Sequence, residues 1–225
     1  MSEDRSPARE AAAAAAVELV EPGMTIGLGS GRAVWRLVEL LGERGVRGPA
    51  VVASERTDVR AREAGIEVVQ LDGSLELDLA LDGADEVDPE LRLIKGGGGA
   101  LLREKIVIAA AQRFVVVAET PKKVDRLGES FRLPVEVVRF AWEDTRRRLA
   151  ALLPDAELRM EENGPYVTDE DHHILDCAIP ADADPDQLDS ALKRIPGVVE
   201  HGLFIGMAER ALLGTPEGGV EVLSA

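Results

Sequence analysis

Short apolar runs alternate with amphipathic segments over the first 130 residues, and glycine or proline stands at most of the boundaries. The run at 25–28 predicts a strand, and the spacing at 33–41 predicts an amphipathic helix after it. The same patterns predict strands at 50–53, 66–71, 77–81 and 114–118 and helices at 8–20, 57–64 and 101–111. Strands that alternate with helices form parallel sheets covered on both faces. The predicted fold class is therefore α/β, with a Rossmann-like parallel-sheet domain.

The pattern changes after Phe131. The apolar spacing there predicts strands at 135–140, 158–160, 174–178 and 198–205 and helices at 142–153 and 188–195. This β-α-β-β-α-β order resembles the split βαβ, or ferredoxin-like, module. We therefore predict a small inserted α+β domain at 131–203, and a Rossmann-like catalytic domain formed by residues 1–130 plus 204–225.

Composition narrows the classes of partner. Hydrophobic residues make up 45% of the 225 residues, enough for a sizeable core. The net charge of −16 disfavours nucleic acid and anionic membranes, because both attract basic surfaces. The single cysteine, Cys177, forms neither an internal disulfide nor, alone, a zinc site. No apolar run is long enough to span a bilayer, and the start of the chain does not resemble a signal peptide. We expect a soluble, cytoplasmic protein whose main partner is neither nucleic acid nor an anionic membrane.

The acidic residues are concentrated in one segment. Residues 151–192 hold twelve Asp or Glu and a single Lys or Arg, which is Arg159. Only five of the 26 basic residues in the chain are lysines. An ordinary acidic protein is one interpretation. The other, which we favour, is a halophilic protein, since dense surface carboxylates keep proteins soluble in a salt-rich cytoplasm.

A glycine-rich turn, Gly27-Leu28-Gly29-Ser30-Gly31, lies where the first predicted strand meets a helix. Glycines there let backbone N–H groups approach an anion, and the helix dipole favours negative charge. The turn lacks the Gly-Lys-Ser/Thr of a Walker loop, and its spacing misses the dinucleotide fingerprint. A tight turn that binds no ligand is the alternative.

Carboxylates follow the strand predicted at 77–81, in Asp82-Gly83-Ala84-Asp85-Glu86. The end of a buried strand is where α/β sheets place ligands. A solvated acidic turn is the alternative. Calcium is disfavoured, because the other ligand positions of a calcium loop are absent.

The segment 94–105 carries the strongest chemical signal. Lys95 precedes four glycines, Gly96 to Gly99, and Glu104 follows in the first predicted helical turn. Ordering four glycines costs much chain entropy, so such a run often marks close approach to a ligand. The pattern brings together a cation, free N–H donors and a potential base. For Glu104 alone, a solvent-facing charge at a helix N-terminus is the alternative.

No metal site is expected. The three histidines are His172, His173 and His201, and none has metal-ligand spacing. They also lie outside the clusters described above. We therefore predict no metal, no cofactor and no catalytic role for His201.

Together these segments resemble ribose-5-phosphate isomerase of the A type. The matching stretches are GLGSG at 27–31, DGADEVDPEL at 82–91, LIKGGGGALLREKI at 93–106, PKKVDRLG at 121–128, LPVEVV at 133–138 and IPGVVEHGLF at 195–204. They cover most of the chain in order. The resemblance implies interconversion of D-ribose 5-phosphate and D-ribulose 5-phosphate without metal, in the non-oxidative pentose phosphate pathway, by a homodimer or homotetramer.

The resemblance also implies roles for individual residues. Glu104 corresponds to the base that moves a proton between C1 and C2, and Lys95 to the group that stabilises the enediolate oxygen. Asp82 and Asp85 correspond to residues that bind sugar hydroxyls and assist ring opening. The residues implied to bind substrate are Ser30, Gly31, Arg32, Ala33, Asp82, Gly83, Ala84, Asp85, Lys95, Gly96, Gly97, Gly98 and Lys122. The turn from Ser30 to Ala33 and Lys122 fall at phosphate positions.

Two features depart from the family pattern. Arg32 and Ala33 stand where the family usually has small hydroxyl residues, and Arg9 stands where it often has a lysine. We expect Arg32 either to grip the phosphate or to point outward and pair with an acidic neighbour. The alternative functions are a non-catalytic sugar-phosphate sensor on a similar fold, and a deaminase-like or CoA-transferase-like enzyme.

Overall fold

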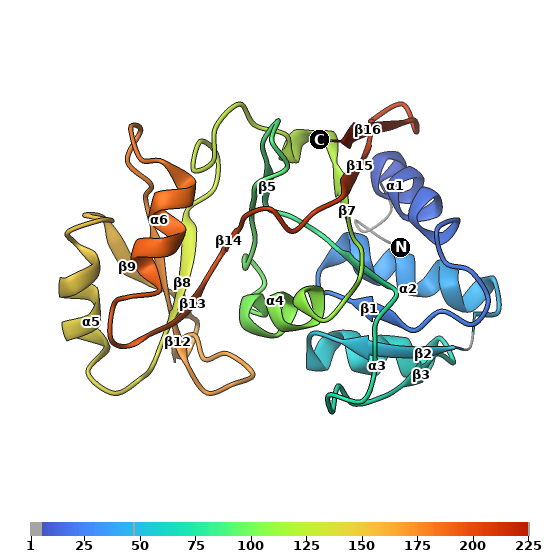
Figure 1. Cartoon of the computed structure of the whole chain (residues 1–225), viewed down its shortest axis with the longest axis horizontal. Helices are drawn as coiled ribbons and strands as arrows, with labels where there is room; N and C mark the ends of the chain where they lie inside the picture. The colour runs from blue at the N-terminus through green and yellow to red at the C-terminus, as the bar shows by residue number, and fades with distance from the viewer. Residues whose placement is uncertain (1–5, 47, 225) are drawn as a thin grey trace.

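The computed structural model describes residues 6–46 and 48–224. Its largest sheet has seven strands, and it lies in the lobe that holds both ends of the described chain (Figure 1). The strand order is β16-β15-β7-β4-β1-β2-β3. The strands are β1 (Ile26–Leu28), β2 (Pro49–Val52), β3 (Glu67–Val68), β4 (Leu79–Asp82), β7 (Phe114–Glu119), β15 (Arg210–Gly214) and β16 (Val220–Ser224). All neighbours are parallel except β15 and β16. The predicted α/β class with a mainly parallel sheet is confirmed.

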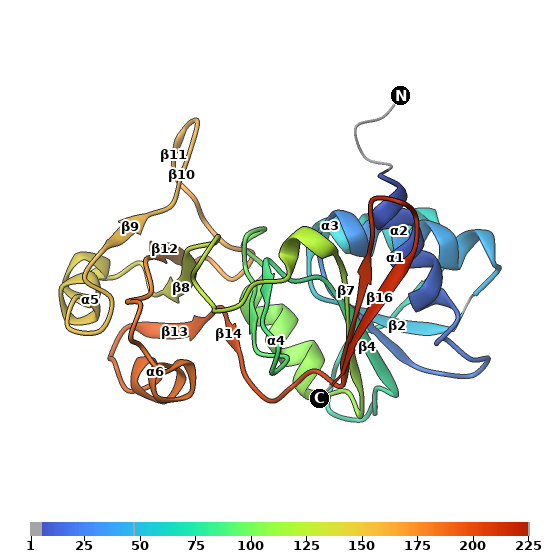
Figure 2. The ribbon, with the colours of Figure 1, turned by 90° about the horizontal axis from the view of Figure 1, so that it is seen from above.

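Helices cover both faces of this sheet (Figure 2). They are α1 (Pro7–Val17), α2 (Arg32–Glu43), α3 (Glu55–Glu63) and α4 (Leu101–Ala109). Helix α2 buries Val34, Leu37, Val38 and Leu41, the spacing of one helical face, in a core shared with α1 and α3. Helix α4 packs on the opposite face through Val107 and Ile108. None of these helices, nor any other in the described part of the chain, has the length and apolar character to cross a membrane.

A second sheet has four antiparallel strands. It lies in a separate lobe (Figure 1). Its order is β13-β8-β12-β9, from β8 (Leu133–Val137), β9 (Ala156–Leu158), β12 (His173–Cys177) and β13 (Val198–His201). Helices α5 (Trp142–Leu149) and α6 (Pro185–Leu192) complete the predicted β-α-β-β-α-β sequence, with a hairpin of β10 (Met160–Glu161) and β11 (Gly164–Pro165) inserted. The domain boundaries at 131 and 203 stay a prediction, and residues 1–5, 47 and 225 lie outside the described part.

The strand predicted at 198–205 is two strands. β13 ends at His201, and β14 (Leu203–Phe204) joins a three-stranded sheet with β6 (Leu93–Ile94) and β5 (Glu86–Val87). The chain passes from one sheet to the other at Gly202. The carbonyl of Gly202 accepts from the Lys95 N–H, and its own N–H donates to Pro134 O. A side chain there would bring its Cβ to 2.2 Å from Lys95 O. The change of sheet therefore requires glycine.

Other element ends differ from the prediction by a few residues. Helix α6 begins at Pro185 rather than 188, because the Asp184 side chain caps it by accepting from the N–H groups of Asp186 and Gln187. β3 is only two residues long, at the edge of the sheet, where a strand has one partner.

Candidate active site

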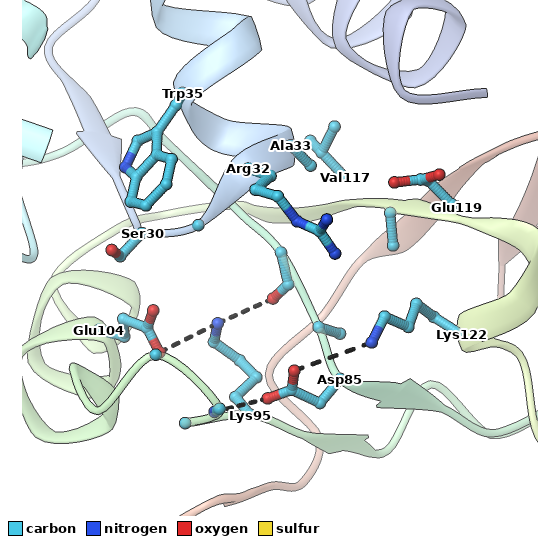
Figure 3. Close-up of a pocket in the computed structure, with 17 residues that line it drawn as sticks. Ser30, Arg32, Ala33, Trp35, Asp85, Lys95, Glu104, Val117, Glu119 and Lys122 are labelled. Carbon is cyan, nitrogen blue, oxygen red and sulfur yellow. Dashed lines mark hydrogen bonds and ion pairs between the residues drawn. The ribbon is translucent and has the colours of Figure 1, made fainter. Parts of the chain in front are cut away.

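A cavity of about 220 Å³ opens where the carboxyl ends of β4 and β7 meet the start of α2 (Figure 3). Gly96, Gly97 and Gly98 line it, and they belong to the segment Gly96–Gly99, which we call the glycine loop. Thirteen of the fourteen residues predicted for the site line it, namely Ser30, Gly31, Arg32, Ala33, Gly83, Ala84, Asp85, Lys95, Gly96, Gly97, Gly98, Glu104 and Lys122. The exception is Asp82.

Lys95 lies between two carboxylates. Its Nζ is 2.8 Å from Asp82 Oδ2 and 3.1 Å from Glu104 Oε2, and it donates to Gly83 O over 2.8 Å. All three side chains are at most 6% exposed. Lys95 leaves β6, Asp82 ends β4, and Glu104 lies in the first turn of α4. Long-range packing thus places a buried cation in contact with a buried potential base.

The burial of this cluster shifts its protonation. The pKa of Glu104 is raised to about 8, mainly by burial and next by the nearby Asp82 carboxylate. Burial also raises the pKa of Asp82. Burial opposes the charge on Lys95, but the carboxylates of Asp82 and Glu104 outweigh it and raise the pKa of the ammonium. Lys95 therefore stays charged, while Glu104 is poised to gain or lose a proton near neutral pH.

Asp82 faces Lys95 rather than the cavity. Its Oδ1 accepts from the N–H groups of Ser30 and Gly83, over 3.1 and 2.7 Å, and the side chain is 1% exposed. Gly29 makes room for it, since a Cβ there would lie 1.8 Å from the Asp82 carboxylate. The predicted direct contact between Asp82 and a sugar hydroxyl is therefore not what this geometry favours.

Asp85 does reach the cavity, together with the glycine loop. Its Oδ2 accepts from the Gly97 N–H over 2.8 Å, and its Oδ1 is 3.9 Å from Lys122 Nζ. Gly96 and Gly99 have φ of +105° and +83°, a region that favours glycine. The loop can therefore present its backbone directly to a ligand.

The opposite end of the cavity suits an anion. Helix α2 begins there after Gly31, whose φ is +111°, and no side chain caps its first N–H groups. Uncapped N–H groups and the helix dipole attract negative charge. Arg32 lines the cavity with its guanidinium directed inward, and Lys122 points in from the other side (Figure 3). Within the described residues no ion pair of Arg32 is found, so this geometry favours phosphate binding over the outward pairing.

Four lining residues were not predicted, and they are Trp35, Val117, Ala118 and Glu119. Val117, Ala118 and Glu119 end β7, which lies beside β4. Because α/β sheets bind ligands at the carboxyl ends of their strands, these three residues could have been predicted from the sequence. Glu119 accepts from Arg9 Nη2 over 2.8 Å. Arg9 is thus engaged by a carboxylate at the rim of the cavity.

The histidines lie apart from this cavity. His201 is fully buried, and burial lowers its pKa to about 3. None of the three lines the cavity, and the described residues contain no group of three or more His, Cys, Asp or Glu that could hold a metal ion.

This arrangement suits proton transfer on a phosphorylated small molecule. A buried carboxyl with a raised pKa can accept a proton from carbon, and the adjacent ammonium can stabilise the oxyanion that forms. The anion end can hold a phosphate some distance from the base.

Comparison with known proteins gives a consistent result. The family model of ribose 5-phosphate isomerase A (phosphoriboisomerase A) matches residues 49–218. Ribose-5-phosphate isomerase A of Roseiflexus castenholzii is 52% identical over 95% of this chain and 94% of that protein, and the one of a Synechococcus strain is 49% identical over 93% and 94%.

Solved structures of ribose 5-phosphate isomerases have the same fold as this chain. A D-ribose-5-phosphate isomerase in complex with phospho-erythronic acid superposes with a TM-score of 0.91, at 38% identity over 96% of this chain and 97% of that one. The ribose 5-phosphate isomerase A of Methanocaldococcus jannaschii superposes with a TM-score of 0.90, at 36% identity over 96% and 98%. This chain belongs to the ribose 5-phosphate isomerase A family.

Proposed function

We propose that this chain is an aldose–ketose isomerase that interconverts D-ribose 5-phosphate and D-ribulose 5-phosphate in the pentose phosphate pathway. The observation that carries the proposal is the buried Lys95 at 2.8 Å from Asp82 and 3.1 Å from Glu104, in a cavity whose other end suits a phosphate. Family membership supports the same substrate.

Glu104 acts as the base. Its carboxylate takes the proton from C2 of the open-chain aldose, and the electrons move to the carbonyl oxygen to give an enediolate. The protonated carboxyl then returns the proton to C1, and a proton passes from the C2 hydroxyl oxygen to the C1 oxygen, which gives the ketose. No net proton is gained or lost, so a single carboxyl serves both steps.

Lys95 stabilises the enediolate. Its ammonium is preorganised by Asp82 and by Gly83 O, so little rearrangement is needed when charge develops on the substrate oxygen. We assign Asp82 to holding Lys95, and Asp85 to the sugar hydroxyls and to ring opening. Arg32, Lys122 and the first N–H groups of α2 hold the phosphate.

The direct test is formation of ribulose 5-phosphate from ribose 5-phosphate, measured with and without a chelator. We expect turnover in both. Binding of ribose 5-phosphate without turnover would favour the sensor. Release of ammonia from an amino sugar phosphate, or an acyl-CoA adduct on a glutamate, would favour the other enzyme classes.

Replacing Arg32 with Ala tests the phosphate end. We expect the KM for ribose 5-phosphate to rise roughly tenfold or more, with a smaller change in kcat, because a guanidinium binds phosphate through two parallel hydrogen bonds. Unphosphorylated ribose serves as the control substrate and should be nearly indifferent to the change. Equal losses on both sugars would mean that the substitution disturbed the loop.

The acidic segment supports a second proposal, that the protein is adapted to salt. Ten of the twelve carboxylates in 151–192 are exposed. Salt screens their mutual repulsion, so the Tm should rise between about 0.1 and 3 M KCl. Thermal unfolding monitored by circular dichroism gives the Tm, and a Tm that does not change with KCl would contradict the proposal. A cytoplasmic location and assembly into a homodimer or homotetramer stay predictions.

A further inference from the structure

Arg159, the single Lys or Arg of the acidic segment, lies behind the glycine loop. It follows β9 in the small lobe, and its side chain is 14% exposed. Its Nη1 donates to Gly96 O over 2.8 Å and to Gly97 O over 3.2 Å. Its Nε and Nη2 donate to the Asp176 carboxylate over 2.9 and 2.5 Å. One guanidinium therefore ties the glycine loop to the four-stranded sheet.

The contacts of Arg159 determine which way the loop peptides face. In a trans peptide the carbonyl and the next N–H point in opposite directions. Because the carbonyls of Gly96 and Gly97 face Arg159, the N–H groups of Gly97 and Gly98 face away from it. The Gly97 N–H indeed donates to Asp85 Oδ2 on that side. The Gly98 N–H has the same direction, and Gly98 lines the active-site cavity.

The glycine loop separates two cavities. Gly97 lines the active-site cavity on one side and, on the other, a cavity of about 640 Å³ that contains Arg159 and Asp176. Tyr166 continues the support, since its hydroxyl donates to Gly98 O over 3.3 Å. Three consecutive carbonyls are thus held from the side of the small lobe.

A run of glycines needs such support, because glycine adopts positive and negative φ almost equally well. A flipped Gly97–Gly98 peptide would present a carbonyl oxygen where negative charge develops. We propose that Arg159, held by Asp176, is a positioning residue that fixes the Gly97–Gly98 peptide with its N–H group toward the enediolate. The inference rests on the proposed isomerase activity, and it gives the small lobe a part in catalysis.

Arg159→Met tests this, with Arg132→Met as the matched control. Arg132 lies in the same lobe and also contacts Asp176, through the backbone carbonyl at 3.1 Å, but within the described residues it has no hydrogen bond to the glycine loop. Losing a preorganised donor should lower the kcat of Arg159→Met roughly tenfold to a hundredfold, with a smaller change in KM. The control should keep kcat within about twofold.

Two competitive inhibitors separate positioning from general damage. Phospho-erythronic acid carries a planar carboxylate with the shape and charge of the enediolate, whereas inorganic phosphate probes only the far end. In Arg159→Met, and less so in Arg159→Lys, the affinity for the acid should fall about tenfold while that for phosphate stays unchanged. If Arg159→Met does not fold, Arg159→Lys, which keeps a cation, carries the same test.

Unchanged kcat in the Arg159 variants would overturn the inference, and so would equal weakening of both inhibitors or an equal loss in Arg132→Met. A wild-type protein without isomerase activity would overturn the proposed function itself. An active wild type with an unaffected Arg159→Met overturns the inference alone.

Discussion

Replacing Glu104 with Gln is expected to lower kcat by about 10²-fold to 10⁴-fold, with substrate binding largely retained. Glutamine keeps the shape of the side chain and its contact with Lys95, but it cannot accept a proton from carbon. Steady-state kinetics on ribose 5-phosphate give kcat and KM. Glu63→Gln, at an exposed position near the end of α3, is the matched control and should behave as wild type. Turnover near the wild-type rate in Glu104→Gln would remove Glu104 from the mechanism.

The dependence of kcat/KM on pH tests the role of Glu104 independently. Glu104 acts as a base only when it is deprotonated, and burial together with Asp82 raises its pKa to about 8. The kcat/KM of the wild type should therefore fall as the pH drops below about 8. Free ribose 5-phosphate titrates near pH 6, so the profile is compared with that of unphosphorylated ribose, and both substrates should show the same acid limb.

Replacing Lys95 with Met is expected to lower kcat by about 10²-fold to 10³-fold, because the enediolate loses its positive partner. It should also destabilise the fold by roughly 3–5 kcal/mol, since Asp82 and Glu104 would stay buried without a counter-charge. Enzyme kinetics and denaturant unfolding measure the two effects separately. A variant with wild-type kcat would contradict the proposed role of Lys95.

A double variant separates the two effects of Lys95. Adding Asp82→Asn to Lys95→Met removes one of the two buried carboxylates, so stability should partly recover. Activity should not recover, because no cation returns to the enediolate oxygen. Recovery of both together would mean that Lys95 has only a structural role.

The repeat of short strands and amphipathic helices is a local property, so the sequence alone predicts the α/β class and the split βαβ order. In α2, for example, the burial of Leu37 and Leu41 follows from their spacing on one helical face. Residue types that adopt unusual backbone conformations are also visible in the sequence alone. The four glycines after Lys95 indicate a ligand-binding loop before any fold is known.

The strands β5 and β6 were not predicted, and β14 was predicted only as the end of a longer strand at 198–205. β5, β6 and β14 have two residues each, too few to show a period of two, and they exist because they pair with one another. The resulting three-stranded sheet brings Lys95 beside Gly202, which is far from it in sequence. Pairing between distant segments cannot be derived from local pattern.

Within the site, the sequence indicated Lys95 and Glu104 as chemical groups, but it did not indicate which residues they contact. That Asp82 faces Lys95 instead of the cavity depends on the space beside Gly29, and that Arg9 is held by Glu119 depends on the packing of α1 against β7. The contact of Arg159 with the glycine loop joins residues more than sixty positions apart. Sequence spacing determines which groups can do the chemistry, whereas burial and orientation come from long-range packing, and only the tertiary structure decides them.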